Sequence, residues 1–187
     1  MLVEVRMINM TELQIGKAIV ELTIGDITTQ TTDAVVNAAN TQLAPGGGVA
    51  GAIHRAAGPQ LWEECKTLGG CQTGEAKLTK GYHLPVPYII HTVGPVYSGS
   101  PDDPKQLASC YKNSLQLARK HNLNSISFPA LSTGYFGYPL KDAATIALTT
   151  VIHDLEQHPD IELVRFVLYD KATKELFEEI LQDKKDH

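Results

Sequence analysis

Residues 37–54 of the chain read NAANTQLAPGGGVAGAIH. They follow a short apolar, β-branched run at residues 33–36, which predicts a strand, and they end in an apolar run from Val49 that predicts a helix. Between them lies a polar loop with two asparagines and three consecutive glycines. Strand, glycine-rich loop and helix in this order typically aim free backbone N–H groups of the helix N-terminus at an anion, usually a phosphate. The stretch therefore predicts a site for a ligand that carries phosphate and sugar.

The same glycines formally match the pattern GxGxxG over residues 46–51. A dinucleotide-binding fingerprint follows its strand almost at once, and an acidic residue ends a second strand about 20 residues later. Here a loop at residues 37–45 intervenes, and the candidate acid, Glu75, follows a loop. We therefore reject a Rossmann NAD site and keep the phosphate-binding interpretation.

Size and composition indicate one globular domain. The chain has 187 residues, of which 43% are hydrophobic and 20% charged, and this length supports a sizeable core. Its net charge of −5 argues against a duplex nucleic-acid partner, which normally requires a basic face. Three cysteines without CxxC spacing suit a reducing compartment. Without a signal pattern or a membrane-spanning apolar run, we expect a soluble, cytoplasmic monomer that contacts no membrane.

Strand and helix patterns alternate along the chain, which predicts an α/β fold with a largely parallel central sheet between helical layers. We expect a turn over residues 9–16, Asp103 and Asp170 as helix N-caps, and a charged, fraying tail at 182–187. Strands are expected at residues 1–7, 17–24, 33–37, 76–82, 88–93, 125–128 and 163–169, and helices at 49–57, 59–67, 104–121, 139–157 and from 171 onward.

Three polar loops follow strands, at residues 25–28, 37–48 and 132–137. Ligands of such sheets bind at the carboxyl ends of the strands, so we expect these loops to converge. Ser132, Thr133 and Gly134 suggest a second anion-binding loop, although an ordinary helix-capping loop has the same composition. Asp26 is able to accept a hydrogen bond from an adenine amine, but its local sequence fits a turn or helix-cap aspartate better.

The histidines give weaker signals. His54 lies four residues after Ala50 on one helix face and is as compatible with a structural role as with acid–base chemistry. His91 ends a core strand and is expected to be buried and hydrogen-bonded. The histidines lack metal-site spacing with Cys or Asp, and the GxSxG, HExxH and GK[ST] signatures are absent from the sequence.

Five motifs, in this order, resemble those of the macrodomain family, and most closely its bacterial and mitochondrial ADP-ribosyl-hydrolase branch. They are Gly25–Thr28 (GDIT), Val36–Leu43 (VNAANTQL), Gly46–Gly58 (GGGVAGAIHRAAG), Ile90–Pro95 (IHTVGP) and Ser132–Pro139 (STGYFGYP). The resemblance covers residues 17–180 of a single domain spanning 1–187. It implies a three-layer α/β/α sandwich with a mixed sheet, in which the first strand pairs antiparallel at an edge.

The resemblance also implies a ligand, ADP-ribose, free or attached to protein. In that case Asp26 accepts from the adenine amine with support from the Ile27 amide, while Asn40 holds the distal ribose. Asn37 is expected to be an internal loop brace rather than a ligand contact, and Asn40 and His54 are the catalytic candidates. No cofactor and no metal are implied. The remaining expected contacts to the distal ribose and diphosphate are Gly46, Gly47, Gly48, Val49, Ser132, Thr133, Gly134, Tyr135 and Phe136.

The implied reaction is hydrolysis of an ester at the distal ribose, in O-acetyl-ADP-ribose or in ADP-ribose carried on a protein Asp or Glu. The sequence departs from the branch at Ala50, where many members have an aspartate that positions or activates water. The alanine is compatible with an engineered change, with a natural variant that uses the substrate's own phosphate as a weak base, and with a reader that binds without turnover. A phosphatase acting on ADP-ribose phosphorylated at the distal ribose is a further alternative.

Overall fold

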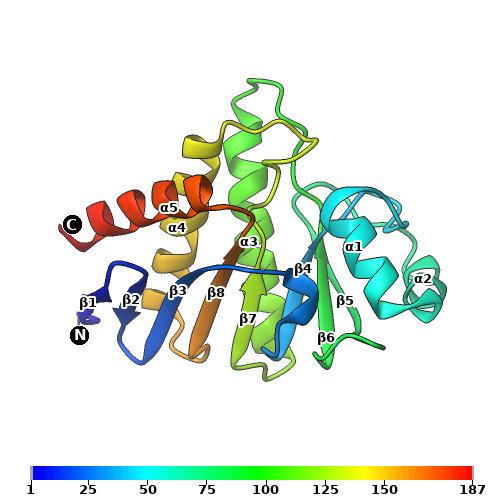
Figure 1. Ribbon diagram of the computed structural model, residues 1–187, viewed down its shortest axis with the longest axis horizontal. Helices are drawn as coiled ribbons and strands as arrows, with labels where there is room; N and C mark the ends of the chain where they lie inside the picture. The colour runs from blue at the N-terminus through cyan, green and yellow to red at the C-terminus, as the bar shows by residue number, and fades with distance from the viewer. Residues whose placement is uncertain (1, 187) are drawn as a thin grey trace.

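The computed structural model describes residues 2–186 and contains a mixed eight-stranded sheet (Figure 1). The strand order is β1-β2-β3-β8-β7-β4-β6-β5. The five central strands, β3, β8, β7, β4 and β6, run parallel, whereas β1, β2 and β5 are antiparallel to their neighbours. The strands are β1 Val5–Asn9, β2 Glu12–Ile15, β3 Ala18–Ile24, β4 Ala34–Ala38, β5 Ala76–Lys80, β6 Tyr88–Thr92, β7 Ser125–Phe128 and β8 Leu163–Leu168.

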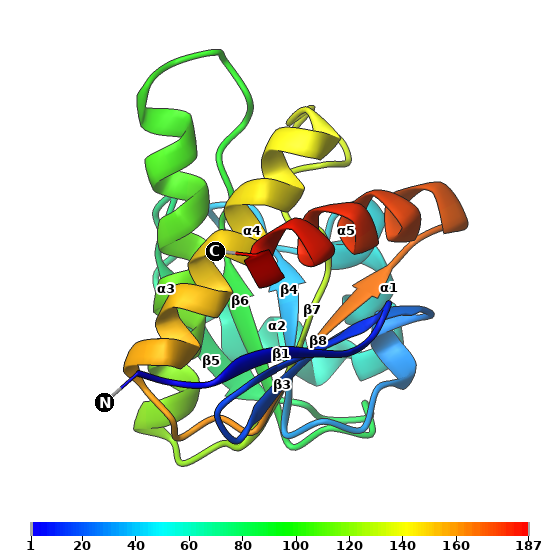
Figure 2. The same ribbon diagram turned by 90° about the vertical axis from the view of Figure 1, so that its left-hand side faces the viewer.

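Helices cover both faces of this sheet (Figures 1 and 2). One face carries α1 Gly48–Ala57 and α2 Pro59–Lys66, and the other carries α3 Asp102–Lys120, α4 Leu140–Gln157 and α5 Lys171–Asp183. Two short 3₁₀ helices, η1 Ile27–Thr29 and η2 Lys184–Asp186, complete the described part of the chain. The predicted three-layer α/β/α sandwich with a mixed, largely parallel sheet is therefore confirmed.

The core strands are apolar on both faces because each face is covered by helices. In β4, Val35 packs into the smaller hydrophobic cluster beneath α1 and α2, whereas Val36 packs into the larger one beneath α3, α4 and α5. Successive strand side chains point to opposite faces, so an uninterrupted apolar run fills both clusters. This arrangement explains why residues 33–37 carry no periodic signal and still form a central strand.

The edge of the sheet differs from the prediction in one element. Residues 9–16 do not form a simple turn, because Glu12–Ile15 is the strand β2, whose Leu13 and Ile15 are buried. The first strand begins at Val5 rather than at residue 1, and Met1 lies outside the described residues. β1 pairs antiparallel with β2 at the sheet edge (Figure 1), which confirms the expected edge pairing.

The two predicted caps have different outcomes. Asp170 caps α5, since its carboxylate accepts from the backbone N–H of Thr173 at 2.8 Å. The prediction for Asp103 is wrong, because α3 begins at Asp102, two residues earlier than expected, and Asp103 lies in its first turn. Its carboxylate instead accepts from the backbone N–H of Ser98 at 2.8 Å and closes the preceding loop.

Candidate functional site

The loop that follows β4 is braced by its own asparagine. The Oδ1 atom of Asn40 accepts from the backbone N–H of Ala44 at 2.9 Å, and its Nδ2 donates to the Ala44 carbonyl at 2.9 Å. Leu43, at a φ of 57°, is buried and anchors the loop to the smaller cluster. These bonds use one Nδ2 proton and one Oδ1 lone pair, so the Asn40 amide retains a donor and an acceptor for a ligand.

The glycines after this loop form the start of α1. Gly47 is the N-cap and makes no side-chain cap bond, and Gly48 begins the helix at a φ of 56°. The first N–H groups of an α-helix have no intrahelical acceptor, and those of α1 follow the exposed residues 46–48. Gly51 is required by packing, because a Cβ there would stand 2.3 Å from the Gly46 carbonyl oxygen. The segment therefore presents backbone donors to an anion without side chains in the way.

The loop after β7 lies beside these glycines. A Cβ placed on Gly47 would be 3.4 Å from the Tyr135 ring, which is 91% exposed. Ser132 is buried at a φ of 66°, and its Oγ occupies the space that a Cβ on Gly94 would fill. Phe136 is half-buried, and its carbonyl accepts from the Tyr97 N–H at 2.8 Å. The structure thus brings the two predicted anion-binding loops together.

Asp26 belongs to the remaining predicted loop, at residues 25–28, and caps η1. Its Oδ1 accepts from the backbone N–H of Thr28 at 2.8 Å and from the Thr28 hydroxyl at 2.7 Å. These hydrogen bonds lower the pKa of the Asp26 carboxyl, which is exposed. Ile27 is buried, and η1 lies against α1. The local sequence correctly indicated a cap, and the carboxylate keeps its Oδ2 outside these two bonds and is able to accept from a ligand amine.

A buried polar network lies beneath α1. The Asn37 Nδ2 lies 3.0 Å from the His91 Nδ1, and the His91 Nε2 lies 2.8 Å from the Thr79 hydroxyl. Both ring nitrogens of His91 therefore have a polar partner, one on each neighbouring strand. The prediction that His91 is buried and hydrogen-bonded is confirmed. Asn37 is internal, but it lies in β4 and links that strand to β6, so the prediction that it braces the loop is wrong. Desolvation, followed by the neighbouring His54, lowers the pKa of His91 to about 3.

His54 lies one helical turn after Ala50, and both side chains are buried. Within the described residues, neither ring nitrogen of His54 has a hydrogen-bond partner. Desolvation lowers the pKa of His54, so the imidazole is neutral at physiological pH. Ala50 places a methyl group, not a carboxylate, in the first turn of α1.

The burial of His91 makes stability depend on pH. Its pKa falls from 6.5 to about 3 on folding, so the unfolded chain takes up the proton first. The contribution of neutral His91 to the free energy of unfolding is therefore complete above about pH 6.5. Below that value, the free energy of unfolding falls by up to about 1.4 kcal/mol per pH unit. Urea unfolding at pH 7, 6, 5 and 4 should show this slope, and His91→Gln should reduce it while His158→Gln, at an exposed position, should not. Equal slopes for all three proteins would contradict the prediction.

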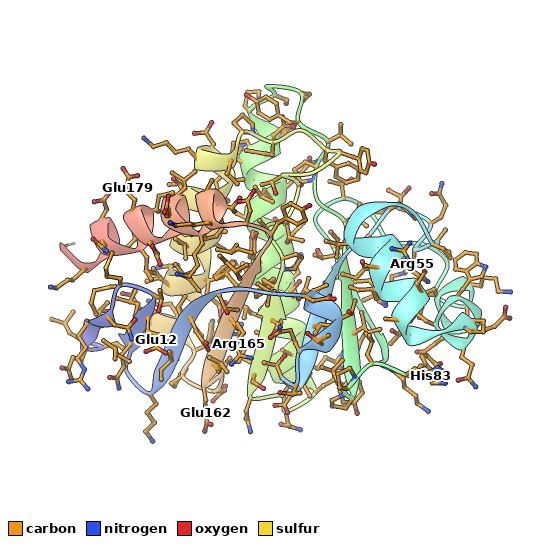
Figure 3. The ribbon with its side chains drawn as sticks, in the orientation of Figure 1. Glu12, Arg55, His83, Glu162, Arg165 and Glu179 are labelled. Atoms are coloured by element: carbon orange, nitrogen blue, oxygen red, sulfur yellow. The ribbon has the colours of Figure 1, made fainter. Side chains whose placement is uncertain are left out.

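Three residues near the site were not singled out from the sequence. Tyr169 is 92% exposed and Ile24 48% exposed, at the carboxyl ends of the adjacent strands β8 and β3, next to the Asp26 loop. Arg55 of α1 is exposed (Figure 3), and its Nη1 lies 3.0 Å from where a Gly51 Cβ would stand. Tyr169 could have been noticed in the sequence, because it is an aromatic residue directly before the helix cap Asp170. The position of the Arg55 charge beside the first turn of α1 could be recognised only in the folded chain.

Among residues 2–186, no group of three or more His, Cys, Asp or Glu side chains is arranged to hold a metal ion. In the same range, no helix combines the length and apolar character needed to cross a bilayer.

Comparisons with known proteins agree with this geometry. The model of the "Macro domain" family matches residues 36–147. The chain is 54% identical over 157 residues to the macro domain-containing protein CT2219 of Chlorobaculum tepidum, covering 83% of this chain and 91% of that protein. It is 55% identical over 138 residues to bovine ADP-ribose glycohydrolase MACROD1, covering 73% of this chain and 42% of that protein. The Oceanobacillus iheyensis macrodomain with ADP superimposes with a TM-score of 0.89 at 41% identity, covering 98% of this chain and 97% of that one. The chain therefore belongs to the Macro domain family.

Proposed function

We propose that this protein binds ADP-ribose and hydrolyses the ester that links ADP-ribose to a carboxylate. Two similarities support the proposal: one relative is named an ADP-ribose glycohydrolase, and a similar macrodomain structure contains ADP. The observation that carries it is the position of the Tyr135 ring, which lies 3.4 Å from where a Cβ on Gly47 would stand and so puts two loops rich in backbone donors side by side at the carboxyl edge of the sheet. A diphosphate between these loops has N–H donors on both sides.

In this proposal the ligand lies across the three loops. The adenine amine donates to Asp26 and is supported by the Ile27 amide. The diphosphate meets the first turn of α1 on one side and Ser132–Phe136 on the other. The distal ribose lies between Asn40 and Phe136, where an ester on it reaches solvent past the exposed Tyr135.

Hydrolysis needs only water as co-reactant. A water molecule attacks the distal ribose carbon that carries the ester, the bond from that carbon to the ester oxygen breaks, and the acceptor leaves as a carboxylate. The attacking water loses its proton to a phosphate oxygen of the substrate, because Ala50 offers no base. The free donor of Asn40 and the α1 amides hold the water, and neutral His54 supports the helix turn that carries them. Positioning and aligned donors supply catalysis without a protein carboxylate.

A second function, recognition of ADP-ribose without turnover, is favoured by one observation. The buried methyl group of Ala50 occupies the place where many hydrolases of the branch carry an aspartate. General-base assistance is typically worth about 10²–10⁴-fold, so its absence is compatible with slow hydrolysis and with none.

Replacement of Asn40 tests the enzyme proposal. We expect Asn40→Ala to lower kcat for release of ADP-ribose about tenfold more than it weakens ADP-ribose binding, because the lost donor acts on the attacking water. Single-turnover rates and calorimetric Kd values measure the two quantities separately. Because Asn40 also braces Ala44, some loss of affinity is expected. Equal losses in rate and affinity would show that Asn40 only braces the loop and takes no part in the mechanism.

A further inference from the structure

A charged row crosses the parallel sheet beneath the Asp26 loop. Arg165 of β8 pairs in register with Glu21 of β3 on one side and with Ser127 of β7 on the other. The neighbours of Arg165 in its strand, Val164 and Phe166, are fully buried, as expected for a core strand of a parallel sheet. Arg165 and Glu21 are only 24% and 26% exposed. An ion pair this sheltered is costly to build unless its remaining donors also find partners.

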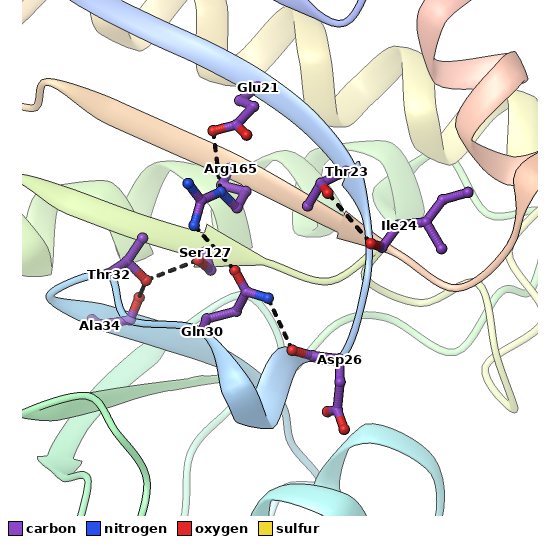
Figure 4. Close-up of polar contacts among 9 residues, drawn as sticks. All are labelled: Glu21, Thr23, Ile24, Asp26, Gln30, Thr32, Ala34, Ser127 and Arg165. Atoms are coloured by element: carbon purple, nitrogen blue, oxygen red, sulfur yellow. Dashed lines mark hydrogen bonds and ion pairs between the residues drawn. The ribbon is translucent and has the colours of Figure 1, made fainter.

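A second donor of Arg165 reaches the Asp26 loop. Its Nε donates to Glu21 Oε2 at 3.1 Å, and its Nη1 donates to Gln30 Oε1 at 3.2 Å. The Gln30 Nε2 in turn donates to the Asp26 carbonyl at 3.0 Å (Figure 4). Arginine only donates and a carbonyl only accepts, so the Gln30 amide fits between them in one orientation. A continuous chain of hydrogen bonds therefore runs from two core strands to the backbone of Asp26.

This chain differs from the other bonds to the Asp26 carbonyl. That oxygen also accepts from the backbone N–H and the hydroxyl of Thr29, at 3.2 and 3.1 Å, but both donors lie within the same short turn. The Gln30 bond is the one that connects the turn to Arg165 on the sheet (Figure 4). The Asp26 carboxylate points away from Gln30 and Arg165 (Figure 4). Because Asp26 caps η1, a movement of η1 would change the direction of this carboxylate.

We propose that Arg165 and Gln30 are positioning residues for adenine recognition, because they hold the Asp26 backbone at the angle from which its carboxylate meets the exocyclic amine. The inference rests on the proposed function, since it concerns the adenine end of the same ligand. In this proposal, selectivity for the adenine base depends on the ion pair of Arg165 with Glu21, although this pair does not contact the ligand. The phosphate and distal-ribose contacts come from α1 and Ser132–Phe136, outside this chain of bonds.

The test compares two ligands in calorimetry, ADP-ribose and ribose 5-phosphate. Gln30→Glu keeps an acceptor for Arg165 but loses the donor to the Asp26 carbonyl, and Arg165→Met removes the link to the sheet. We expect either change to weaken ADP-ribose about tenfold while the Kd of ribose 5-phosphate stays within about twofold. Arg6→Met is the matched control, because Arg6 makes a similar bond to Gln14 Oε1 at 2.9 Å on the far edge strand and should leave both ligands unaffected.

The outcomes separate this inference from the proposed function. If the unmodified protein binds no ADP-ribose, the proposed function fails before any variant is considered. If it binds ADP-ribose and both variants weaken the two ligands equally, the ion pair only stabilises the fold and the inference is overturned. Unchanged affinity for both ligands overturns it as well. A selective loss of ADP-ribose, with the urea midpoint of Gln30→Glu close to that of the parent, supports it.

Discussion

Gly51→Ala is expected to weaken ADP-ribose binding by about 100-fold or more, equivalent to about 2.7 kcal/mol. The added Cβ would stand 2.3 Å from the Gly46 carbonyl oxygen and 3.3 Å from the carbonyl carbon, so the backbone of the glycine loop must shift. Alanine otherwise favours a helix over glycine by about 1 kcal/mol, which partly offsets this strain in stability. The affinity loss arises because the displaced loop carries the donors for the diphosphate. Calorimetry with ADP-ribose measures it.

The control for this change is Gly16→Ala, which is strained for a different reason. Gly16 has a φ of 57° and lies between β2 and β3, at the far edge of the sheet. Its alanine variant should lose stability and keep its affinity for ADP-ribose. Wild-type affinity in Gly51→Ala, or an equal affinity loss in both variants, would show that the packing of Gly46 on Gly51 does not shape the site.

Asp26→Ala is expected to weaken ADP-ribose about 30-fold and to leave ribose 5-phosphate nearly unchanged. A hydrogen bond to a charged group is worth about 1.5–3 kcal/mol, which corresponds to roughly 10- to 150-fold in Kd. Ribose 5-phosphate has no adenine and does not reach this carboxylate. Because the carboxyl is already ionised well below neutral pH, the Kd of ADP-ribose should not vary with pH between 6 and 8 through this group.

Asp26→Asn serves as the matched variant. It keeps an acceptor for the Thr28 N–H and so preserves the η1 cap, while it removes the charge. We expect a smaller loss of ADP-ribose affinity than for alanine. Equal losses of both ligands in Asp26→Ala would mean that the aspartate acts only as a cap, which is the interpretation that its local sequence favoured.

Features of the fold that depend on neighbouring residues were predictable from the sequence. The strand at residues 125–128 and the Asp170 cap were placed correctly, since a polar–apolar alternation that ends at a proline and a polar residue before a helix are local signals. The strand Glu12–Ile15 was missed because it lies between two turns, at residues 10–11 and 16–17, and its identity depends on pairing with β1 and β3. Asp103 was misplaced because its partner, Ser98, lies in the preceding loop.

The candidate site shows the same division. The glycine loop and the loop at residues 132–137 were predicted to be anion-binding segments, and parallel topology accounts for their meeting. The burial of His54, the second role of Asn40 as a brace and the link from Arg165 to Asp26 depend on contacts between distant segments. Such contacts leave no pattern in a single stretch, and only the folded chain brings them together.

Release of free ADP-ribose from a glutamate-linked mono-ADP-ribosylated protein tests the central claim most directly. The assay should compare this protein, its Ala50→Asp variant and a sample without enzyme. We predict release by this protein well above the uncatalysed rate, at a rate similar to that of Ala50→Asp, because the substrate's phosphate serves as the base. Release by Ala50→Asp alone would show that Ala50 disables a hydrolase and that the chain as it stands is a binder. No release by either protein, with ADP-ribose binding intact, would contradict the hydrolase account and leave recognition as the function.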